Sequence, residues 1–398
     1  MNPPSRRLRL ALVVTAVLVL AGGSLSYVLD ARHRERPPGQ QADASFTVEE
    51  PGLYFRDTAG GRVARQGGPG LPRVTGGPSC DRFHTAGGHA LCLRKLPGVP
   101  ARTEALVLDG RLREVRKVTV PGIPNRARVS ASGQVLSWTT FTTGDSYNTA
   151  AFSTRTAVLD LRTGYLIKSI EQIPLTLGGT RHHDSDVNYW GVTFAADDNR
   201  FYATVSTRGI THLVEGDLRA WSAKALRENA ECPSLSPDGT RVAFKKKVSD
   251  DPRAPWRLYV LDLATMREHP SAEAHSVDDQ AAWLDDSTLA YALPGRGGRA
   301  SDIWSVPADG TGQPRLLAPD ASSPAAIGPG VLQLRRAATS QAVVPTTAAS
   351  SSAPASAATG SGTGPGPDAV TRADTAPRAG ENGRTQASRE PRVPARTP

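Results

Sequence analysis

The stretch Cys232-Pro-Ser-Leu-Ser-Pro-Asp-Gly-Thr-Arg-Val-Ala-Phe244 decides the fold of this chain. It predicts two apolar strands joined by the tight turn Ser236-Pro-Asp-Gly239. In such a turn proline presets the backbone of the first position, aspartate accepts hydrogen bonds from nearby backbone amides, and glycine supplies the positive φ of the reversal. Degraded copies of this strand pair occur on both sides of it, and recurrence of this kind is typical of repeat architectures.

A second type of hairpin, an apolar strand that ends in an acidic or glycine turn, occurs six times, and we expect it to form the third and fourth strands of each repeat. The copies are Gly52–Asp57, Ala105–Gly110, Thr156–Gly164, Thr211–Asp217, Leu258–Leu263 and Asp302–Gly310. The last three turns lie about 47 residues apart, which is the spacing of a four-stranded propeller blade. Because one blade cannot bury both of its faces alone, the blades must stack. We therefore expect an all-β protein with a six-bladed β-propeller over residues 51–335.

A further strand pair precedes most of these hairpins, as at Val129–Trp138 and Ala282–Tyr291. The first hairpin has no such pair before it, and one spare pair remains at the far end, over residues 323–334. We predict that residues 323–334 pair with residues 52–66 and complete one blade. Closure of this kind removes exposed strand edges, which are prone to aggregate.

These residues resemble a known family. Ser236-Pro-Asp-Gly239 with Arg241-Val-Ala-Phe244, followed by Trp256–Asp262 and Asp302–Gly310, is similar to the repeat of TolB-like β-propellers, and the resemblance covers about residues 125 to 320. It implies a propeller and a location in the cell envelope. It does not imply Tol-Pal function, because we expect no room ahead of residue 52 for the separate N-terminal domain of TolB. The composition resembles that of a membrane-anchored actinobacterial protein.

The N-terminus predicts export. Arg6-Arg7-Leu-Arg9 precedes about twenty uncharged residues, Leu10–Leu29, which is long enough for a helix to cross a bilayer. We expect residues 1–9 to be a cytoplasmic basic region, residues 10–29 a transmembrane helix, and residues 30–50 a linker to an extracytoplasmic propeller. A cleaved signal peptide is the alternative, because Ala21-Gly-Gly-Ser24 supplies small residues after a shorter apolar run. We therefore expect the protein to be located in the cell membrane, or to be secreted if this segment is cleaved.

Residues 336–398 consist mostly of Ala, Ser, Thr, Pro and Gly and contain no aromatic side chain. Such a segment cannot bury a core, so we expect a disordered tail. The net charge of +9 is concentrated at the two ends: residues 1–36 carry +4 and residues 337–398 carry +2, which leaves +3 for the rest. That balance argues against a nucleic-acid partner. The run Lys245–Lys247 is expected to be a solvated strand end.

Cys80 and Cys92 flank a glycine-rich loop, and outside the cytoplasm the pair is most simply a disulfide. A zinc site is a poorer explanation, since the spacing is too wide and there is no second cysteine pair. The third cysteine, Cys232, precedes an apolar strand and is expected to be a buried small residue rather than a nucleophile.

The cluster of polar residues that best suits a binding or catalytic site is Arg181-His182-His183-Asp184-Ser185-Asp186. Its two histidines and two aspartates, His182, His183, Asp184 and Asp186, are weak candidates for a divalent metal site. The plainer interpretation is an exposed polar loop that caps a strand end. Aromatic residues at expected loop sites, Tyr147, Tyr189 and Trp190, are candidates for a partner-facing surface.

No Gly-x-Ser-x-Gly elbow, His-Glu-x-x-His motif or phosphate-binding loop occurs in the sequence. We therefore expect no catalytic residues and no cofactor, and a non-enzymatic module that binds a protein or envelope component through the loop-rich face of the propeller. The alternative function is a metal-dependent propeller enzyme, a lyase or glycan hydrolase, that uses the His182, His183 and Asp184 loop.

Overall fold

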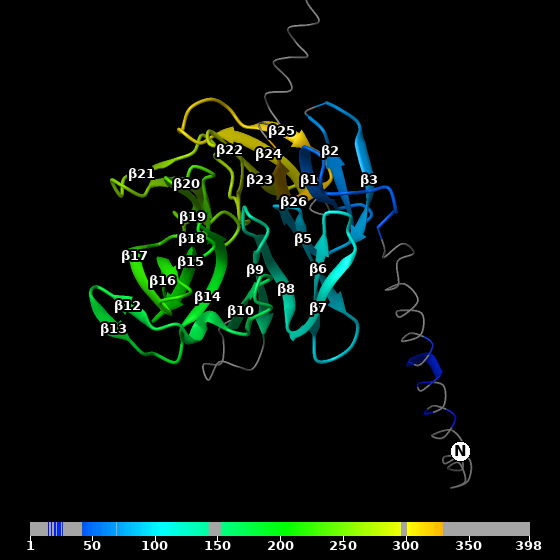
Figure 1. Cartoon of the computed structure of the whole chain (residues 1–398), viewed down its shortest axis with the longest axis horizontal. Coiled ribbons are helices and arrows are strands. Elements are labelled where there is room, and N and C mark those ends of the chain that lie inside the picture. Colours follow the sequence, from blue (N-terminus) through cyan, green and yellow to red (C-terminus); the bar gives the residue numbers. More distant parts are fainter. Residues whose placement is uncertain are drawn as a thin grey trace, which may run out of the picture. The chain divides into compact units, whose positions relative to one another are not determined.

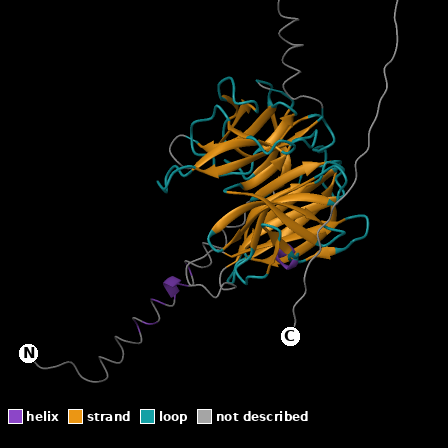
Figure 2. Ribbon diagram, turned by 90° about the vertical axis from the view of Figure 1, so that its left-hand side faces the viewer, coloured by secondary structure: helices purple, strands orange, loops and turns teal. Residues whose placement is uncertain are grey.

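The computed structural model describes residues 42–68, 70–142, 153–295 and 301–328, together with scattered positions between Thr15 and Ser26. These residues form six sheets whose innermost strands contact one another in a closed ring (Figure 1). Figure 2 shows that the body is built from strands joined by loops and turns. The expected all-β six-bladed propeller is confirmed.

In each blade the first strand lies at the central channel and the fourth strand lies farthest from it. Blade 1 is β26 (Ala321–Ile327), β1 (Gly52–Asp57), β2 (Arg62–Gln66) and β3 (Arg73–Ser79); blade 2 is β4 (Arg82–Ala86), β5 (His89–Leu96), β6 (Arg102–Asp109) and β7 (Glu114–Pro121); blade 3 is β8 (Ile123–Val129), β9 (Val135–Thr142), β10 (Ser153–Asp160) and β11 (Leu166–Ile167). Blade 4 is β14 (Asn188–Phe194), β15 (Arg200–Thr207), β16 (Ile210–Asp217) and β17 (Ser222–Glu228); blade 5 is β18 (Glu231–Leu235), β19 (Arg241–Lys247), β20 (Trp256–Asp262) and β21 (Glu268–Pro270); blade 6 is β22 (Ala282–Asp285), β23 (Thr288–Pro294), β24 (Ser301–Pro307) and β25 (Arg315–Ala318).

Blade 1 closes the ring with strands from both ends of the propeller. β26 pairs antiparallel with β1, with Leu53 opposite Ala326 and Tyr54 opposite Ala325 (Figure 1). The predicted pairing is therefore confirmed for residues 323–327, while residues 331–334 lie outside the described residues.

The assignment of Gly52–Asp57 as a third strand was wrong, because β26 takes the innermost place and makes β1 the second strand. The fourth strand, β3, was not predicted, since its sequence contains two glycines and a proline. The fold requires those glycines: a Cβ atom on Gly76 would lie 2.7 Å from the Phe46 ring, and one on Gly77 would lie 2.5 Å from Val63.

Blade 4 carries an extra hairpin at its outer edge. β12 (Leu175–Leu177) pairs parallel with β17 and antiparallel with β13 (Thr180–His182), so this sheet has six strands. A short 3-10 helix, η1 (Ile170–Gln172), precedes the hairpin, and Ile170 is fully buried. The hairpin leads into the polar loop that the sequence singled out.

The apolar core lies between neighbouring blades. Alternate side chains of each strand face opposite sides of the sheet, so each blade packs against the blades before and after it. Leu91 of blade 2 belongs to one buried cluster with Trp138 of blade 3, and Phe55 of blade 1 belongs to another with Leu284 and Ile303 of blade 6. Burial of these interfaces drives the ring to close.

The turns that join the first and second strands of blades 2 to 6 lie on one face of the ring, which we call the turn face; the opposite face is the loop face. Side chains link these turns from blade to blade. Ser132 donates to Asp198 (2.7 Å), and the amide of Asp238 donates to Asp286 (2.9 Å). Gly239 adopts a φ of +72°. The acidic turns thus link blade 3 to blade 4 and blade 5 to blade 6 on the turn face.

The segment before β1 packs against the propeller. Phe46 and Val48 are buried, and the Val48 amide donates to the Gly110 carbonyl (2.8 Å). The expected linker therefore ends before residue 50. No helix among the described residues is long and apolar enough to cross a membrane. The expected tail, residues 336–398, lies outside the described residues.

Candidate functional site

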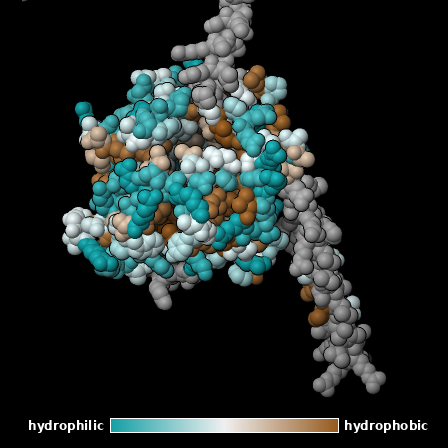
Figure 3. Space-filling view, viewed as in Figure 1, coloured by the Kyte–Doolittle hydropathy of each residue, from teal (hydrophilic) through white to brown (hydrophobic). Residues whose placement is uncertain are grey.

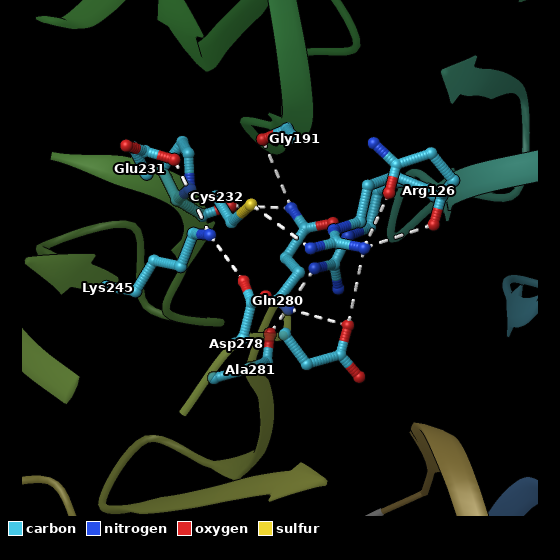
Figure 4. Close-up of polar contacts among 12 residues, drawn as sticks. Arg126, Gly191, Glu231, Cys232, Lys245, Asp278, Gln280 and Ala281 are labelled. Atoms are coloured by element: carbon cyan, nitrogen blue, oxygen red, sulfur yellow. Dashed lines mark hydrogen bonds and ion pairs between the residues drawn. The ribbon is translucent and has the colours of Figure 1, made fainter. Parts of the chain in front are cut away.

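Charged side chains from several blades meet in the central channel. Arg126 of β8 extends toward Cys232 of β18, whose Sγ lies 3.5 Å from Nη2 (Figure 4). Arg126 Nη1 donates to Asn125 Oδ1 (2.8 Å) and lies 3.7 Å from the carboxylate of Asp279. Strands far apart in the sequence thus converge on one polar cluster. Cys232 is buried, as the sequence predicted.

Lys245 lies next to this cluster and is only 6% exposed. Its Nζ donates to Asp278 (2.6 Å), lies 3.5 Å from Glu231, and stands 4.0 Å from the centre of the Trp256 ring (Figure 4). The expectation that Lys245 belongs to a solvated strand end was wrong, because β19 directs this side chain inward, where it contacts carboxylates. Burial acts to lower the pKa of Lys245, but its negatively charged surroundings outweigh burial and raise it.

Arg128 occupies the channel nearer the turn face. Its Nη1 lies 3.1 Å from His84 Nε2, and its Nη2 donates to the Ala281 carbonyl (3.3 Å). His84 Nδ1 accepts from the Val129 amide (3.1 Å). Burial, and secondly the charge of Arg128, hold the pKa of His84 well below its ordinary value, so the imidazole is neutral.

Two neighbouring hollows lie along this channel. The wider one, the mouth, has a volume of about 360 Å³ and is lined by residues at the turn-face ends of the inner strands, among them His84, Arg128 and Trp283. The narrower one has a volume of about 30 Å³ and is lined deeper in the channel by Arg82, Arg126 and Asp279. His84 and Arg128 line both hollows, so they connect the mouth to the deeper charges.

The loop singled out by the sequence brings together three of its four candidate ligands. One ligand atom each of His182, Asp184 and Asp186 lies within 4.8 Å of the others, while His183 is exposed and outside the cluster. Arg208 already supplies a cation here: its guanidinium donates to Asp184 and its amide to Asp186 (2.5 Å). A divalent ion would have to compete with this guanidinium for Asp184.

A hydroxyl at the end of β15, that of Thr207, lies beside a histidine of this loop. Thr207 Oγ1 lies 2.8 Å from His182 Nε2 and donates to Asp186 (2.6 Å), so the histidine donates to the hydroxyl and does not accept its proton. Asp184 approaches the same nitrogen (3.4 Å), whereas a catalytic triad needs the acid on the other ring nitrogen. Thr207 is also buried. The polar groups here therefore satisfy one another's hydrogen bonds, with no group left poised for catalysis.

Of the aromatic residues proposed to face a partner, Tyr189 was assigned wrongly. Tyr189 is fully buried between blades 3 and 4, because its position on β14 directs the ring into the apolar cluster around Val158 and Phe201. Trp190 is partly exposed on the same strand, and Tyr147 lies outside the described residues.

A different pair of aromatic residues lies at the surface. Tyr165, 68% exposed, and Trp221 line a groove of about 820 Å³ between blades 3 and 4 on the turn face. Arg162 and Arg219 lie in the same groove. The sequence offered a signal that we missed: both aromatic residues stand in turns rather than strands, where burial in a blade interface is not available. On the side viewed in Figure 3, hydrophobic patches lie among hydrophilic side chains.

Cys80 and Cys92 are joined in a disulfide, in line with their expected pairing (S–S 2.02 Å). Cys80 precedes β4 and Cys92 lies in β5, so the bond ties the start of blade 2 to its second strand. Both sulfurs belong to buried residues between blades 1 and 2.

The topology defines the class of this protein, a six-bladed β-propeller closed by one C-terminal strand. No model of a protein family and no curated protein matches its sequence. Among solved structures it is similar to TolB from Acinetobacter baumannii (15% identity, TM-score 0.48), with 69% of this chain and 65% of that chain covered. This chain thus spans less than two thirds of the length of TolB.

Other structural neighbours are proteins of different kinds. A chain of the nidogen/laminin complex matches at 11% identity and a TM-score of 0.45, with 69% of this chain and 98% of that chain covered. An oligogalacturonate lyase in complex with manganese matches at 10% identity and a TM-score of 0.40, with 65% and 78% covered. At such identities the likeness concerns the fold, and the function has to be argued from the site.

Proposed function

We propose that this protein is a TolB-like, non-enzymatic binding module, tethered to the cell membrane with its propeller on the extracytoplasmic side, and that it binds a protein partner through the groove at Tyr165 and Trp221. We assign the contact to the turn face instead of the loop-rich face. The observation that carries the assignment is an exposed tyrosine beside a tryptophan in a groove of about 820 Å³.

The composition of the groove supports a protein partner. Trp, Tyr and Arg are the residue types most enriched among those that dominate binding energy at protein interfaces, and all three line this groove. Arg162 is engaged by Asp160 and Asp198. Arg219 is exposed, and no ion pair within 4 Å involves it among the described residues. An acidic side chain on the partner would complement Arg219.

Two features support the extracytoplasmic location. The Cys80–Cys92 disulfide is of the kind that forms and persists in oxidising compartments. Residues 10–29 combine the length and low charge of a membrane-spanning segment with preceding arginines that favour a cytoplasmic N-terminus.

Site-specific photo-crosslinking of the full chain in living cells tests the proposed partner surface. A photoreactive phenylalanine at Tyr165 should give one reproducible covalent adduct with another protein. The same residue at Val99, which is fully exposed on the turn between β5 and β6 at the loop face, is the matched control and should not give that adduct. Equal adducts from both positions, or none from Tyr165, would contradict the proposal.

Substitution of the same residue measures its contribution. Tyr165→Ala should weaken binding to the captured partner about 30-fold or more, the effect of losing a residue that anchors an interface. The free energy of unfolding should stay within about 0.5 kcal/mol of the wild type, because the side chain is mostly exposed. Unchanged affinity would remove the groove from the interface.

A metal-dependent enzyme is the second candidate function, favoured by the close approach of His182, Asp184 and Asp186. Metal analysis of the purified full chain after incubation with manganese, zinc or calcium tests it. One tightly held ion per chain, lost in His182→Ala and retained in His183→Ala, would support this candidate. The contacts of Arg208 with both aspartates lead us to expect no such ion.

A further inference from the structure

The innermost strands of blades 2 and 3 concentrate positive charge deep in the channel. Arg82 on β4, and Arg126 and Arg128 on β8, line the same hollow of about 30 Å³. Asp279 is the only carboxylate among the described residues that line it. Three guanidinium groups therefore face one carboxylate, at a depth where solvent screens charge poorly.

Hydrogen-bond donors in this hollow also outnumber acceptors. The Nε atoms of Arg126 and Arg128 are buried and have no hydrogen-bond partner. The two ring nitrogens of His84 face two further donors, the Val129 amide and Arg128 Nη1, each at 3.1 Å. A neutral imidazole has one lone pair and can accept from only one of them. At least three N–H groups in the cluster thus lack an acceptor.

Arg128 shows this excess of positive charge and of hydrogen-bond donors most clearly. No carboxylate among the described residues forms an ion pair with it, and its remaining hydrogen bond is to the Ala281 carbonyl. Burial lowers the pKa of Arg128 to about 10. Burying a charge without a partner is unfavourable, and an anion would supply both the missing charge and the missing acceptors.

We propose that the channel binds an oxyanion, a carboxylate, phosphate or sulfate group, between Arg128, Arg126 and Arg82. The deep hollow is large enough for about one water-sized group, such as an oxyanion oxygen. The rest of a small ligand would occupy the mouth of about 360 Å³, which His84 and Arg128 also line and which has the size of a small-molecule site. The mouth shares no lining residue with the Tyr165 groove, so this site is independent of the proposed protein contact.

Calorimetric titration of the purified full chain with sulfate, phosphate and acetate tests the proposal. Sodium chloride at equal ionic strength is the control for each salt, because sulfate stabilises most proteins without binding them specifically. At least one oxyanion should bind saturably. Arg128→Gln should weaken that binding about 10- to 100-fold, the effect of losing a charged hydrogen bond. Arg219→Gln, an exposed arginine on the same face, should bind as the wild type does.

The ranking of the three anions identifies the source of the group. Tighter binding of acetate indicates a carboxylate ligand, and tighter binding of sulfate or phosphate indicates a tetrahedral oxyanion. If circular dichroism shows that Arg128→Gln does not fold, Arg82→Gln replaces it, since Arg82 makes no ion pair among the described residues. No saturable binding of any oxyanion, or equal binding by the wild type and the folded channel variant, would overturn the proposal.

Discussion

The blade interfaces and the central channel bury side chains in opposite ways. Between blades 6 and 1 the buried side chains are apolar, with Phe55 packed in one cluster with Leu284 and Ile303. In the channel the buried side chains are charged, with Lys245 beside Glu231. Apolar burial stabilises a ring directly, whereas desolvated charges at best offset their own cost. The interfaces therefore supply most of the stability of the propeller, and the charged channel contributes little of it.

The largest effect should come from an interface residue. Phe55→Ala removes a fully buried ring between the first and last blades and should lower the free energy of unfolding by about 3–5 kcal/mol. Urea denaturation of wild type and variant measures the difference. A loss below about 1 kcal/mol would mean that the closing interface contributes little, and would weaken the comparison.

A charge placed within an interface should be penalised. Glu171 lies between blades 3 and 4, where it accepts hydrogen bonds from the Ser169 hydroxyl and the Thr156 amide. Burial raises the pKa of Glu171 from 4.5 to about 7. The native state therefore holds a proton that the unfolded state has lost between these two pH values, so this group's contribution to the free energy of unfolding falls as pH rises from 4.5 to 7.

Glu171→Gln should remove that pH dependence. At pH 8 the variant should be more stable than the wild type by an amount on the order of 3 kcal/mol, and at pH 4 the two should be nearly equal. Urea denaturation at both pH values measures the difference. If the variant is equally stable to the wild type at pH 8, the carboxylate finds better solvation in this interface than its burial implies.

In the channel, removing one charge should matter more than removing a matched pair. Lys245→Met leaves Glu231 buried without its cation and should cost about 2 kcal/mol of unfolding free energy. The double variant Lys245→Met, Glu231→Gln should recover most of that loss, because the buried charge of Glu231 is removed as well and Asp278, the other partner of Lys245, is exposed to solvent. Equal losses in the single and double variants would show that this ion pair stabilises the ring after all.

Local chemistry explains why the fold was predictable. The turn Ser236-Pro-Asp-Gly239 and its copies mark blades 3 to 6 in the sequence, and the hairpin at Ala105–Gly110 marks blade 2. The spare strand at residues 323–327 identified the closing pair. β3 was missed because its glycines are required by Phe46 and Val63, contacts that no local pattern reveals.

The candidate sites were less predictable for a related reason. Tyr189 and Tyr165 are both tyrosines near polar loops in the sequence, yet one is fully buried and the other is 68% exposed. The difference depends on which face of a strand or turn each occupies. The channel cluster draws on Arg126 of blade 3, Cys232 of blade 5 and Asp279, which precedes blade 6, and these residues share no sequence pattern.

By itself, the sequence determined the class of fold, the number of blades and the cysteine pair, since turn residues, strand periodicity and cysteine spacing act over a few residues at a time. Only the tertiary structure decided that Lys245 is buried, that the guanidinium of Arg208 pairs with Asp184, and that buried arginines converge in the channel. Closing the ring brings distant inner strands together, and charge balance in the channel is set by that convergence.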